Sequence, residues 1–476
     1  MDQRDAPITQ KILQNLKNFD GIQPVSLPNM LTTQLCDYQH QGLNWLAFLY
    51  EYGFGGILAD DMGLGKTLQV LSLVAHLKET GQLYKPVLVV APTSLLGNWQ
   101  RETQRFTPDL SVQILYGTDR HQALKQLDKH DIFVTSYNLL LLDNEYYERH
   151  AFSVLVLDEA QAIKNPQTKT SLAVRRLSAD MRLGLSGTPL ENHLGELWSL
   201  MDFALPGLLF GRQLFNDYYR NPIEKEQDAW AQQQLAQKIS PFILRRTKAQ
   251  VAKELPEKTV LMQYVALGEK QAALYEAIRV SMEKRIRDLV AKQGMAKSHI
   301  EFLDALLKLR QACIAPQLVK LDQAKTITES AKLEWLAEHL PEMIEEGRRI
   351  LLFSQFTQAL ALVEDVLNKS KIAYSKLTGA TRKRQEVIDA FQKGEVPIFL
   401  ISLKAGGSGL NLTAADTVIH LDPWWNPAVE NQATDRAYRI GQDKPVFVYK
   451  LVAENTVEER IARLQQKKSV SRRVIL

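Results

Sequence analysis

The sequence has little of what marks secreted, metal-caged or membrane-spanning chains. Its 476 residues include two cysteines, Cys36 and Cys313, which are too few and too far apart for a disulfide framework or a cysteine metal site. No run of 18 or more apolar residues occurs, which argues against a spanning helix. The N-terminal stretch lacks the basic start and apolar centre of a signal peptide. These absences favour a folded protein of a reducing cytosol, with no membrane partner.

Net charge is also small, because 58 basic and 54 acidic residues leave +4. Its distribution is more informative. Residues 34–205 contain 14 basic and 19 acidic residues, a net of −5, whereas residues 206–325 contain 20 and 13, a net of +7. Residues 326–476 contain 21 and 19, a net of +2. The positive middle segment would suit a phosphate backbone, although a solvated helical face explains the same charge equally well.

Short apolar runs alternate with helical patterns in two parts of the chain. The runs of the first part are 87–91, 132–135, 154–157 and 183–185, and those of the second are 350–353, 398–401, 418–421 and 446–449. Strands that alternate with helical stretches, such as 67–77 and 172–177, are typical of βαβ units in a parallel sheet. We therefore expect an α/β protein with two separate parallel-sheet lobes.

The middle segment differs from both parts. Residues 206–325 are rich in Gln, Lys, Glu and Leu at helical spacing, with helices expected over 269–289 and 300–313. We interpret this segment as helical protrusions and a linker. The expected organisation is a lead segment (1–33), a first lobe (34–205), the helical segment (206–325), and a second lobe (326–476) with a terminal helix over 456–468.

A candidate phosphate-binding loop lies between a short apolar strand and a helix. It reads Asp60, Asp61, Met62, Gly63, Leu64, Gly65, Lys66, Thr67. Such a loop turns backbone N–H groups toward phosphate oxygens at a helix N-terminus. Lys66 would reach the β- and γ-phosphates, and the Thr67 hydroxyl would coordinate Mg²⁺. Asp60 stands where the usual pattern has its first glycine, and a chance Gly-Lys-Thr turn is the alternative interpretation.

A pair of acids, Asp158 and Glu159, ends the apolar run 154–157. Two carboxylates at the end of a buried strand are costly without a cation. Asp158 would hold Mg²⁺ through water, and Glu159 would polarise the attacking water. Acids at a helix start are the simpler explanation. That explanation does not account for their coincidence with the phosphate loop, so the two motifs together predict nucleotide hydrolysis with ATP and Mg²⁺.

Five segments then occur in the order of a superfamily-two helicase: 60–67, 158–161, 185–192, 403–412 and 432–442. Longer stretches resemble the SWI/SNF family within it, namely Asp-Asp-Met-Gly-Leu-Gly-Lys-Thr-Leu-Gln (60–69), Asp-Glu-Ala-Gln-Ala-Ile-Lys-Asn (158–165) and Leu-Asp-Pro-Trp-Trp-Asn-Pro (421–427). The resemblance covers about residues 34–465. It implies two RecA-like lobes with ATP in the cleft between them, and a motor that moves along double-stranded DNA without separating its strands.

Three positions point to a bacterial-like branch of this family. Cys36 stands where an arginine is common, Ala315 stands where nucleosome-remodelling relatives carry histidine, and Gln161 ends the Asp-Glu motif. The resemblance implies a nucleoid-associated, cytoplasmic protein if the source is bacterial, and a nuclear one if it is eukaryotic. We expect a monomer. RNA polymerase or another DNA-bound protein is a candidate partner beside the DNA.

Further roles follow from the resemblance, residue by residue. Gln39 matches the glutamine that reads adenine, and Gln161 and Gly409 match nucleotide-site positions. Thr188 and Glu191 match a motif that couples hydrolysis to lobe movement. The DNA-contacting positions are Thr93, Ser94, Asn98, Trp99, Ser136 and Tyr137 in the first lobe, and Gln355, Thr378, Gly379, Lys404 and Gly406 in the second. Routine helix caps explain such Ser and Thr residues equally well.

Arg436 and Arg439 match arginine fingers, which stabilise charge on the transferring phosphate. Their spacing would place them on one helix face with Gln432. A surface salt bridge with Asp435 or Asp443 is the simpler alternative. Trp424 and Trp425 would suit base stacking, but we expect both to pack in the core. Lys and Arg in 245–248 are expected on the DNA side.

Two other functions stay open from the sequence. A strand-separating helicase uses the same two lobes, although the helical insertion and the Trp424-Trp425 pair favour a translocase. A nucleotide-gated scaffold that binds DNA or RNA polymerase would need no turnover, and the intact Lys66, Asp158 and Glu159 argue against it.

Overall fold

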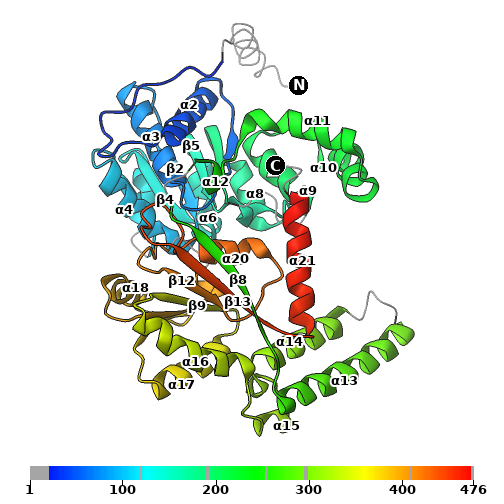
Figure 1. Ribbon diagram of the computed structural model, residues 1–476. Coiled ribbons are helices and arrows are strands. Elements are labelled where there is room, and N and C mark those ends of the chain that lie inside the picture. The colour runs from blue at the N-terminus through cyan, green and yellow to red at the C-terminus, as the bar shows by residue number, and fades with distance from the viewer. Residues whose placement is uncertain are drawn as a thin grey trace. The chain divides into compact units, whose positions relative to one another are not determined.

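The computed structural model describes residues 21–117, 120–187, 193–251, 255–293, 299–406 and 410–472. These residues form two units, which divide between residues 251 and 255. Each unit is built around one parallel sheet with helices on its faces (Figure 1). The expected α/β class with two parallel-sheet lobes is confirmed. Within the described parts of the chain, no helix has the length and apolar character needed to cross a membrane.

The first unit has a seven-stranded sheet with the order β3-β4-β2-β5-β6-β1-β7, in which the paired strands are parallel. Its strands are β1 (Gly56–Leu58), β2 (Val87–Ala91), β3 (Val112–Ile114), β4 (Ile132–Ser136), β5 (Ala151–Asp158), β6 (Ser178–Leu185) and β7 (Ile243–Leu244). Along β2, Val87 and Val89 join one apolar cluster, and Leu88 and Val90 join the other. Both faces are therefore buried, which is why the strands read as continuous apolar runs.

The helices of the first unit follow the strands in βαβ order. The longer ones are α2 (Asp37–Glu51), α3 (Lys66–Glu79), α4 (Leu96–Phe106), α8 (Lys169–Arg176), α9 (Leu194–Ala204) and α11 (Ala229–Ile239). The shorter ones are α5 (Arg120–Ala123), α6 (Tyr137–Leu142), α7 (Asn144–Glu148), α10 (Arg212–Phe215) and α12 (Lys248–Val251), with 3₁₀ turns η1 (Thr93–Leu95) and η3 (Ala160–Ile163) and π-helical turns η4 (Asn216–Arg220) and η5 (Pro222–Glu226).

The second unit has a six-stranded parallel sheet with the order β10-β11-β9-β12-β13-β8. Its strands are β8 (Lys258–Val265), β9 (Ile350–Ser354), β10 (Tyr374–Leu377), β11 (Ile398–Ser402), β12 (Thr417–His420) and β13 (Val446–Ala453). Its helices are α13 (Glu269–Gln293), α14 (His299–Ile314), α15 (Asp322–Lys325), α16 (Ala331–Glu345), α17 (Thr357–Lys369), α18 (Arg384–Lys393), α19 (Leu403–Gly406), α20 (Pro427–Thr434) and α21 (Val457–Arg472).

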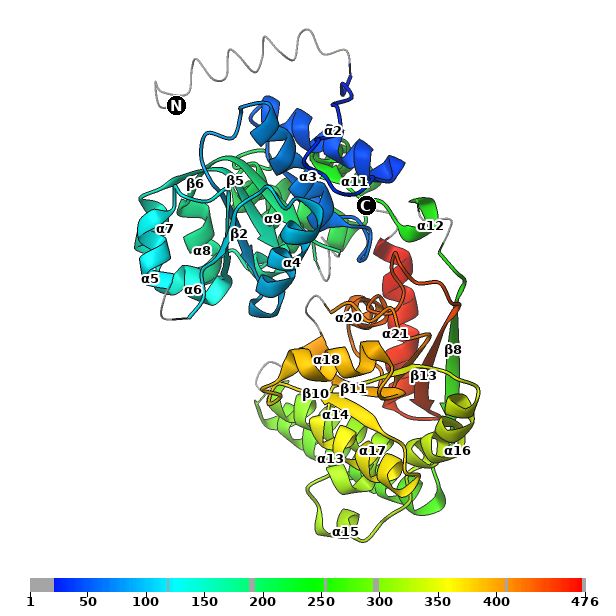
Figure 2. The same ribbon diagram turned by 90° about the vertical axis from the view of Figure 1, so that its left-hand side faces the viewer.

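The segment expected to be mostly helical protrusions and a linker, 206–325, is divided between the units and contains strands. β7 joins the first sheet, and β8 pairs with β13 at the edge of the second sheet, as Figure 2 shows. β8 is largely exposed, so its sequence lacks the apolar run that marks a buried strand. Helices α13 and α14 then pack together through a small apolar cluster that includes Tyr275 and Cys313.

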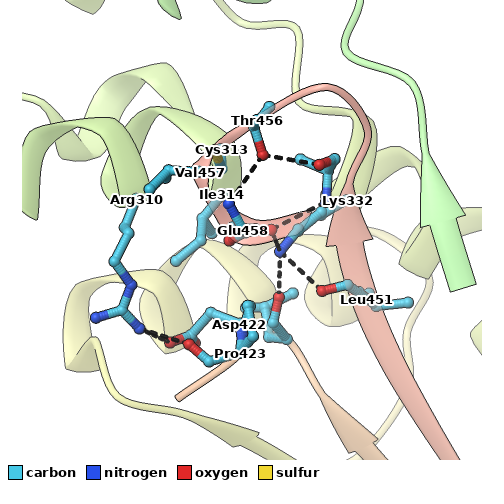
Figure 3. Close-up of polar contacts among 12 residues, drawn as sticks. Arg310, Cys313, Ile314, Lys332, Asp422, Pro423, Leu451, Thr456, Val457 and Glu458 are labelled. Atoms are coloured by element: carbon cyan, nitrogen blue, oxygen red, sulfur yellow. Dashed lines mark hydrogen bonds and ion pairs between the residues drawn. The ribbon is translucent and has the colours of Figure 1, made fainter. Parts of the chain in front are cut away.

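A buried ion pair fixes the terminal helix α21 to the second sheet. The Nζ of Lys332 on α16 lies 2.6 Å from Oε2 of Glu458 on α21, and both side chains are fully buried. Lys332 also donates to the Leu421 carbonyl at 2.7 Å, and Figure 3 shows its hydrogen bond to the Leu451 carbonyl, which is 3.1 Å long. Burial raises the pKa of Glu458, and the Lys332 ammonium opposes that rise. The pair therefore needs both members.

We expect Lys332→Met to destabilise the protein by about 3–5 kcal/mol, because it leaves the Glu458 carboxylate buried without a cation. Urea unfolding of the full chain measures the loss. The matched control is Lys383→Met, which removes an exposed Lys383–Glu386 pair and should cost about 0–1 kcal/mol. Equal effects of the two substitutions would contradict the assigned role of the buried pair.

Candidate functional site

The phosphate loop connects the end of β1 to the start of α3. Gly63 and Gly65 have φ values of 84° and 76°, a left-handed conformation that favours glycine. Lys66 is the first residue of α3, and its Nζ donates to the backbone oxygens of Asp60 (2.6 Å) and Asp61 (3.3 Å). The loop thus wraps around the Lys66 ammonium at a helix N-terminus, an arrangement suited to phosphate oxygens.

Asp60 has a structural reason for replacing the usual glycine. Its side chain is fully buried, and Nε of Arg246 donates to Oδ1 at 2.9 Å. The backbone N–H of Arg246 (3.1 Å) and the Gln69 amide (3.1 Å) also donate to this carboxylate. Arg246 further donates to the Tyr38 carbonyl and to Oε1 of Gln69. One arginine therefore joins the loop, α2, α3 and the segment after β7.

This arrangement corrects the expectation for two members of the basic cluster 245–248, Arg246 and Lys248. Arg246 is 8% exposed and Lys248 is 6% exposed, so neither side chain lies on an open surface. The backbone N–H of Lys248 donates to Oδ2 of Asp61 at 3.0 Å. Arg246 and Lys248 therefore support the phosphate loop. Sequence analysis missed this role, although an aspartate in the place of a glycine was a signal that a compensating cation was needed.

Gln39 is buried beside the same loop. Its Nε2 donates to the Leu64 carbonyl at 3.3 Å, and its Oε1 accepts the backbone N–H of Cys36 at 3.0 Å. A Cβ at Gly65 would lie 2.6 Å from Nε2 of Gln39. Gln39 therefore lies against the loop and helps to begin α2. Its expected contact with adenine stays a prediction.

The paired acids lie at the carboxyl end of β5. Oδ2 of Asp158 accepts the indole N–H of Trp99 at 2.9 Å, and Oδ1 accepts the backbone N–H of Glu159 at 2.9 Å. Glu159 has a φ of 51°, a strained conformation for a residue with a side chain. The Gln161 amide donates to Glu159 at 2.6 Å and accepts from Ser186 Oγ at 3.0 Å. The ends of β5 and β6 are therefore joined.

The charges at this edge of the first sheet suit a metal cation beside the acids and a phosphate anion beside Lys66. Burial and the nearby Glu159 raise the pKa of Asp158 to about 7, while the Trp99 hydrogen bond and Lys66 oppose the rise. Burial lowers the pKa of Lys66, and the carboxylates of Glu159, Asp60 and Asp158 oppose the decrease. Lys66 and the two acids thus interact across the loop, which brings the predicted catalytic residues of the first unit together.

A magnesium ion fits this donor set. Among the described residues, no group of three or more His, Cys, Asp or Glu residues could hold a metal ion by itself. Mg²⁺ at a nucleotide site characteristically uses one or two protein ligands beside phosphate and water oxygens. Asp158 supplies a carboxylate whose described hydrogen-bond donors are two neutral N–H groups. Thr67, at the second position of α3, supplies a hydroxyl.

The predicted DNA-contacting residues of the first unit divide by exposure. Thr93 and Ser94 are exposed after β2. Asn98 is half-buried, and its amide donates a hydrogen bond to Glu102. Trp99 is 1% exposed, and Ser136 is 2% exposed and caps α6 by accepting from Leu139 N–H. Tyr137 is also buried, and its hydroxyl donates to the Asp158 carbonyl at 2.8 Å. Trp99, Ser136 and Tyr137 therefore have internal hydrogen bonds, and their expected DNA contacts stay predictions.

The predicted DNA-contacting residues of the second unit follow the ends of the adjacent strands β9, β10 and β11. They are Gln355, Thr378, Gly379, Lys404 and Gly406. Gly379 and Lys404 are exposed and Gln355 is half-buried, whereas Thr378 is 9% exposed and Gly406 is buried. A Cβ at Gly406 would lie 2.9 Å from Ile401 Cγ2, so this glycine is required for close packing. Thr378 and Gly406 are thus buried, and their expected DNA contacts stay predictions.

Arg310 of α14 is a residue that sequence analysis missed. Its Nη1 donates to Oε1 of Gln355 at 3.1 Å, and its Nη2 donates to the Pro423 carbonyl at 2.7 Å. The same guanidinium lies 3.6 Å from Oδ2 of Asp422, and Figure 3 shows the two side chains beside each other. It also lies over the rings of Trp424 and Trp425. Trp424 packs against the core as expected, but Trp425 is 36% exposed.

The two predicted arginine fingers do not share a helix face with Gln432. Helix α20 ends at Thr434, because the N–H groups of Arg436 and Ala437 bond three residues back and tighten the chain into turns. Arg436 is 1% exposed, and its Nη1 donates to the Leu410 carbonyl at 3.5 Å, whereas Arg439 is half-buried. Their action on phosphate stays a prediction. Gly409, Thr188 and Glu191 lie outside the described residues.

Comparison with known proteins identifies the class. Residues 38–318 match the SNF2-related domain, and residues 331–441 match the helicase conserved C-terminal domain. The chain therefore belongs to the SNF2-related family, as the resemblance predicted.

Individual relatives agree with this membership. The protein YwqA of Bacillus subtilis is 42% identical over 449 residues, which are 92% of this chain and 48% of YwqA. The ISWI chromatin-remodelling complex ATPase ISW2 of Saccharomyces cerevisiae is 37% identical over 93% of this chain and 41% of its own length. This chain thus spans about half or less of these curated relatives. The Sulfolobus solfataricus SWI2/SNF2 ATPase core in complex with dsDNA is 37% identical, with a TM-score of 0.50 and 94% coverage of both chains. The two RecA-like lobes are those of this family.

Arg246→Met should weaken nucleotide binding strongly, because it leaves the Asp60 carboxylate buried in the phosphate loop without a cation. Binding of a fluorescent ATP analogue measures the effect. The double variant Asp60→Gly, Arg246→Met removes both charges and restores the usual glycine, so it should recover most of the affinity. Arg149→Met, which removes an exposed pair with Glu145, is the control. An Arg246→Met protein with unchanged affinity would contradict the assigned support.

Proposed function

We propose that this chain is a Mg²⁺-dependent ATPase that moves along double-stranded DNA and remodels protein–DNA complexes. The observation that supports it most is the meeting of Lys66 with Asp158 and Glu159 at the carboxyl ends of β1 and β5, the two strands that flank β6. Membership of the SNF2-related family, and the duplex DNA named for the Sulfolobus solfataricus core, support DNA as the partner.

In this proposal each residue has a distinct task. Lys66 and the N-terminus of α3 bind the β- and γ-phosphates. Glu159, held by Gln161, orients water and accepts its proton as the water oxygen bonds to the γ-phosphorus and ADP leaves. Asp158 and Thr67 would hold Mg²⁺, which supplies positive charge to the phosphate oxygens when bound. Gln161 also bonds Ser186, so the state of Glu159 is linked to the segment after β6.

The residues proposed to contact DNA are exposed or half-buried in each unit by itself: Thr93, Ser94 and Asn98 in the first unit, and Gln355, Gly379 and Lys404 in the second. Hydroxyls, amides, backbone and one ammonium suit phosphate oxygens and carry no base-reading pattern. We therefore infer binding with little dependence on sequence. RNA polymerase or another DNA-bound protein as the displaced partner, and a monomeric state, belong to the same proposal.

Glu159→Gln should retain ATP binding but lose turnover, because a neutral amide cannot accept the proton from water. Phosphate release with and without DNA measures turnover, and binding of a fluorescent ATP analogue measures affinity. Glu145→Gln changes a side chain that is 87% exposed and serves as the matched control. Normal turnover in a folded Glu159→Gln protein would exclude the role of Glu159 as the base, and a wild-type chain without turnover would favour the scaffold.

Turnover should rise with duplex DNA of any sequence, and DNA affinity should decrease with salt by a log–log slope of about −0.9 per phosphate neutralised. Lys404→Ala should remove one phosphate contact and so reduce the magnitude of the total salt slope by about one unit. Lys85 precedes β2 and so lies at the amino ends of the strands of the first sheet, opposite their carboxyl ends. Lys85→Ala should leave the total salt slope unchanged. Triplex displacement without strand displacement is expected. Better stimulation by single-stranded RNA, or separation of duplex strands, would contradict the translocase.

A further inference from the structure

Two buried aromatic residues hold Asp158 from neighbouring strands. The strand order β4-β2-β5 places the residues after β4, β2 and β5 side by side at one edge of the first sheet. Trp99, on the helix that follows β2, donates its indole N–H to Oδ2 of Asp158 at 2.9 Å. Tyr137, which follows β4, donates its hydroxyl to the Asp158 backbone carbonyl at 2.8 Å. The side chain and the main chain of Asp158 are thus both held.

These contacts restrict how the Asp158 carboxylate can turn. Oδ2 accepts the Trp99 N–H, and Oδ1 accepts the backbone N–H of Glu159 at 2.9 Å. Donors on opposite oxygens fix the plane of the carboxylate, and the remaining lone pairs then point in a set direction. A partner of this kind behind a metal-binding group orients it and tunes its affinity. The orientation depends on the position of Trp99, because indole has a single donor.

Trp99 is also joined to the exposed end of its helix. Thr93 and Ser94 are exposed in η1, which leads directly into α4, whereas Leu95 and Leu96 are buried beside them. Trp99 lies within the first turn and a half of α4, so a displacement of the helix start moves the indole with it. The same short element therefore has hydroxyls on the surface and a donor on Asp158.

We propose that Trp99 and Tyr137 are positioning residues that link DNA contact at Thr93 and Ser94 to the orientation of the Asp158 carboxylate. The proposal rests on the proposed function. It assigns to DNA stimulation a physical route within the first unit: phosphate contact at the start of α4, the indole N–H, and the carboxylate that would hold Mg²⁺. Tyr137 keeps the Asp158 backbone in place while α4 adjusts.

A purely structural role would give different results. Trp99 belongs to an apolar cluster and contributes packing whether or not its N–H is used. Trp99→Phe keeps an aromatic ring but removes the donor, and Tyr137→Phe removes one hydroxyl with little change in shape. Leu96→Ala is the matched control, because it removes packing from the same helix and leaves both donors intact.

The first measurement is binding of a fluorescent ADP analogue across a Mg²⁺ titration, which does not depend on turnover. Trp99→Phe should raise the half-saturating Mg²⁺ concentration by about tenfold or more. Tyr137→Phe should raise it less, because it releases the main chain and leaves the carboxylate contact. Binding without Mg²⁺ should be unchanged in both variants. An unchanged Mg²⁺ dependence in Trp99→Phe, or an equal shift in Leu96→Ala, would overturn the positioning role.

The second measurement repeats the Mg²⁺ titration with saturating duplex DNA. DNA should lower the half-saturating Mg²⁺ concentration of the wild-type protein and of Leu96→Ala, but should have little effect on Trp99→Phe. The double variant Thr93→Ala, Ser94→Ala should have the wild-type half-saturating Mg²⁺ concentration without DNA, and DNA should change that concentration little, as in Trp99→Phe. An equal effect of DNA on the wild type and Trp99→Phe would overturn the link. Failure of the proposed function would appear separately, as a wild-type protein that does not bind duplex DNA.

Discussion

The buried carboxylate of Asp60 is the constraint on which the nucleotide site depends. A fully buried charge needs a cation and several donors, and Arg246 supplies most of them from a segment 186 residues away in sequence. The same guanidinium bonds the Tyr38 carbonyl and Gln69. A Cβ at Gly42 would lie 1.9 Å from Gln69 Oε1, so α2 can approach this cluster because residue 42 is glycine. The phosphate loop therefore has its shape only when α2, α3 and the segment after β7 are all in place.

Parallel strands then determine which side chains can act together. In the first unit the strands β4, β2, β5, β6 and β1 are neighbours, and their carboxyl ends bring Tyr137, Asp158 and Lys66 to one edge. Position at this edge does not by itself give exposure. Trp99 and Tyr137 point inward to Asp158, whereas Thr93 and Ser94 remain open. The buried residues of this edge thus orient the acids, whereas its exposed residues are available to a DNA backbone.

The buried strands could be predicted from sequence because burial on both faces leaves continuous apolar runs. The run 350–353 differs from β9 by one residue. The exposed edge strand β8 could not be predicted in this way. The nucleotide-site residues were predictable from motif order, but side-chain direction was not. Ser136 caps a helix and Gly406 packs against Ile401, although both resemble DNA-contacting positions of the family. Residue type indicates what a group can bond, and tertiary packing decides which partner it meets.

The basic excess of 206–325 shows the same distinction for charge. Two of its arginines are internal, and each serves one unit. Arg246 neutralises Asp60 beside the phosphate loop, and Arg310 lies 3.6 Å from Asp422 while it bonds Gln355. Both acids lie just after the end of a strand. Among the described residues, neither carboxylate has another arginine or lysine within ion-pair distance. The segment between the two sheets therefore supplies a structural cation to each functional edge. Its net charge overstates the charge available to a phosphate backbone, because these two guanidiniums are already committed to buried partners.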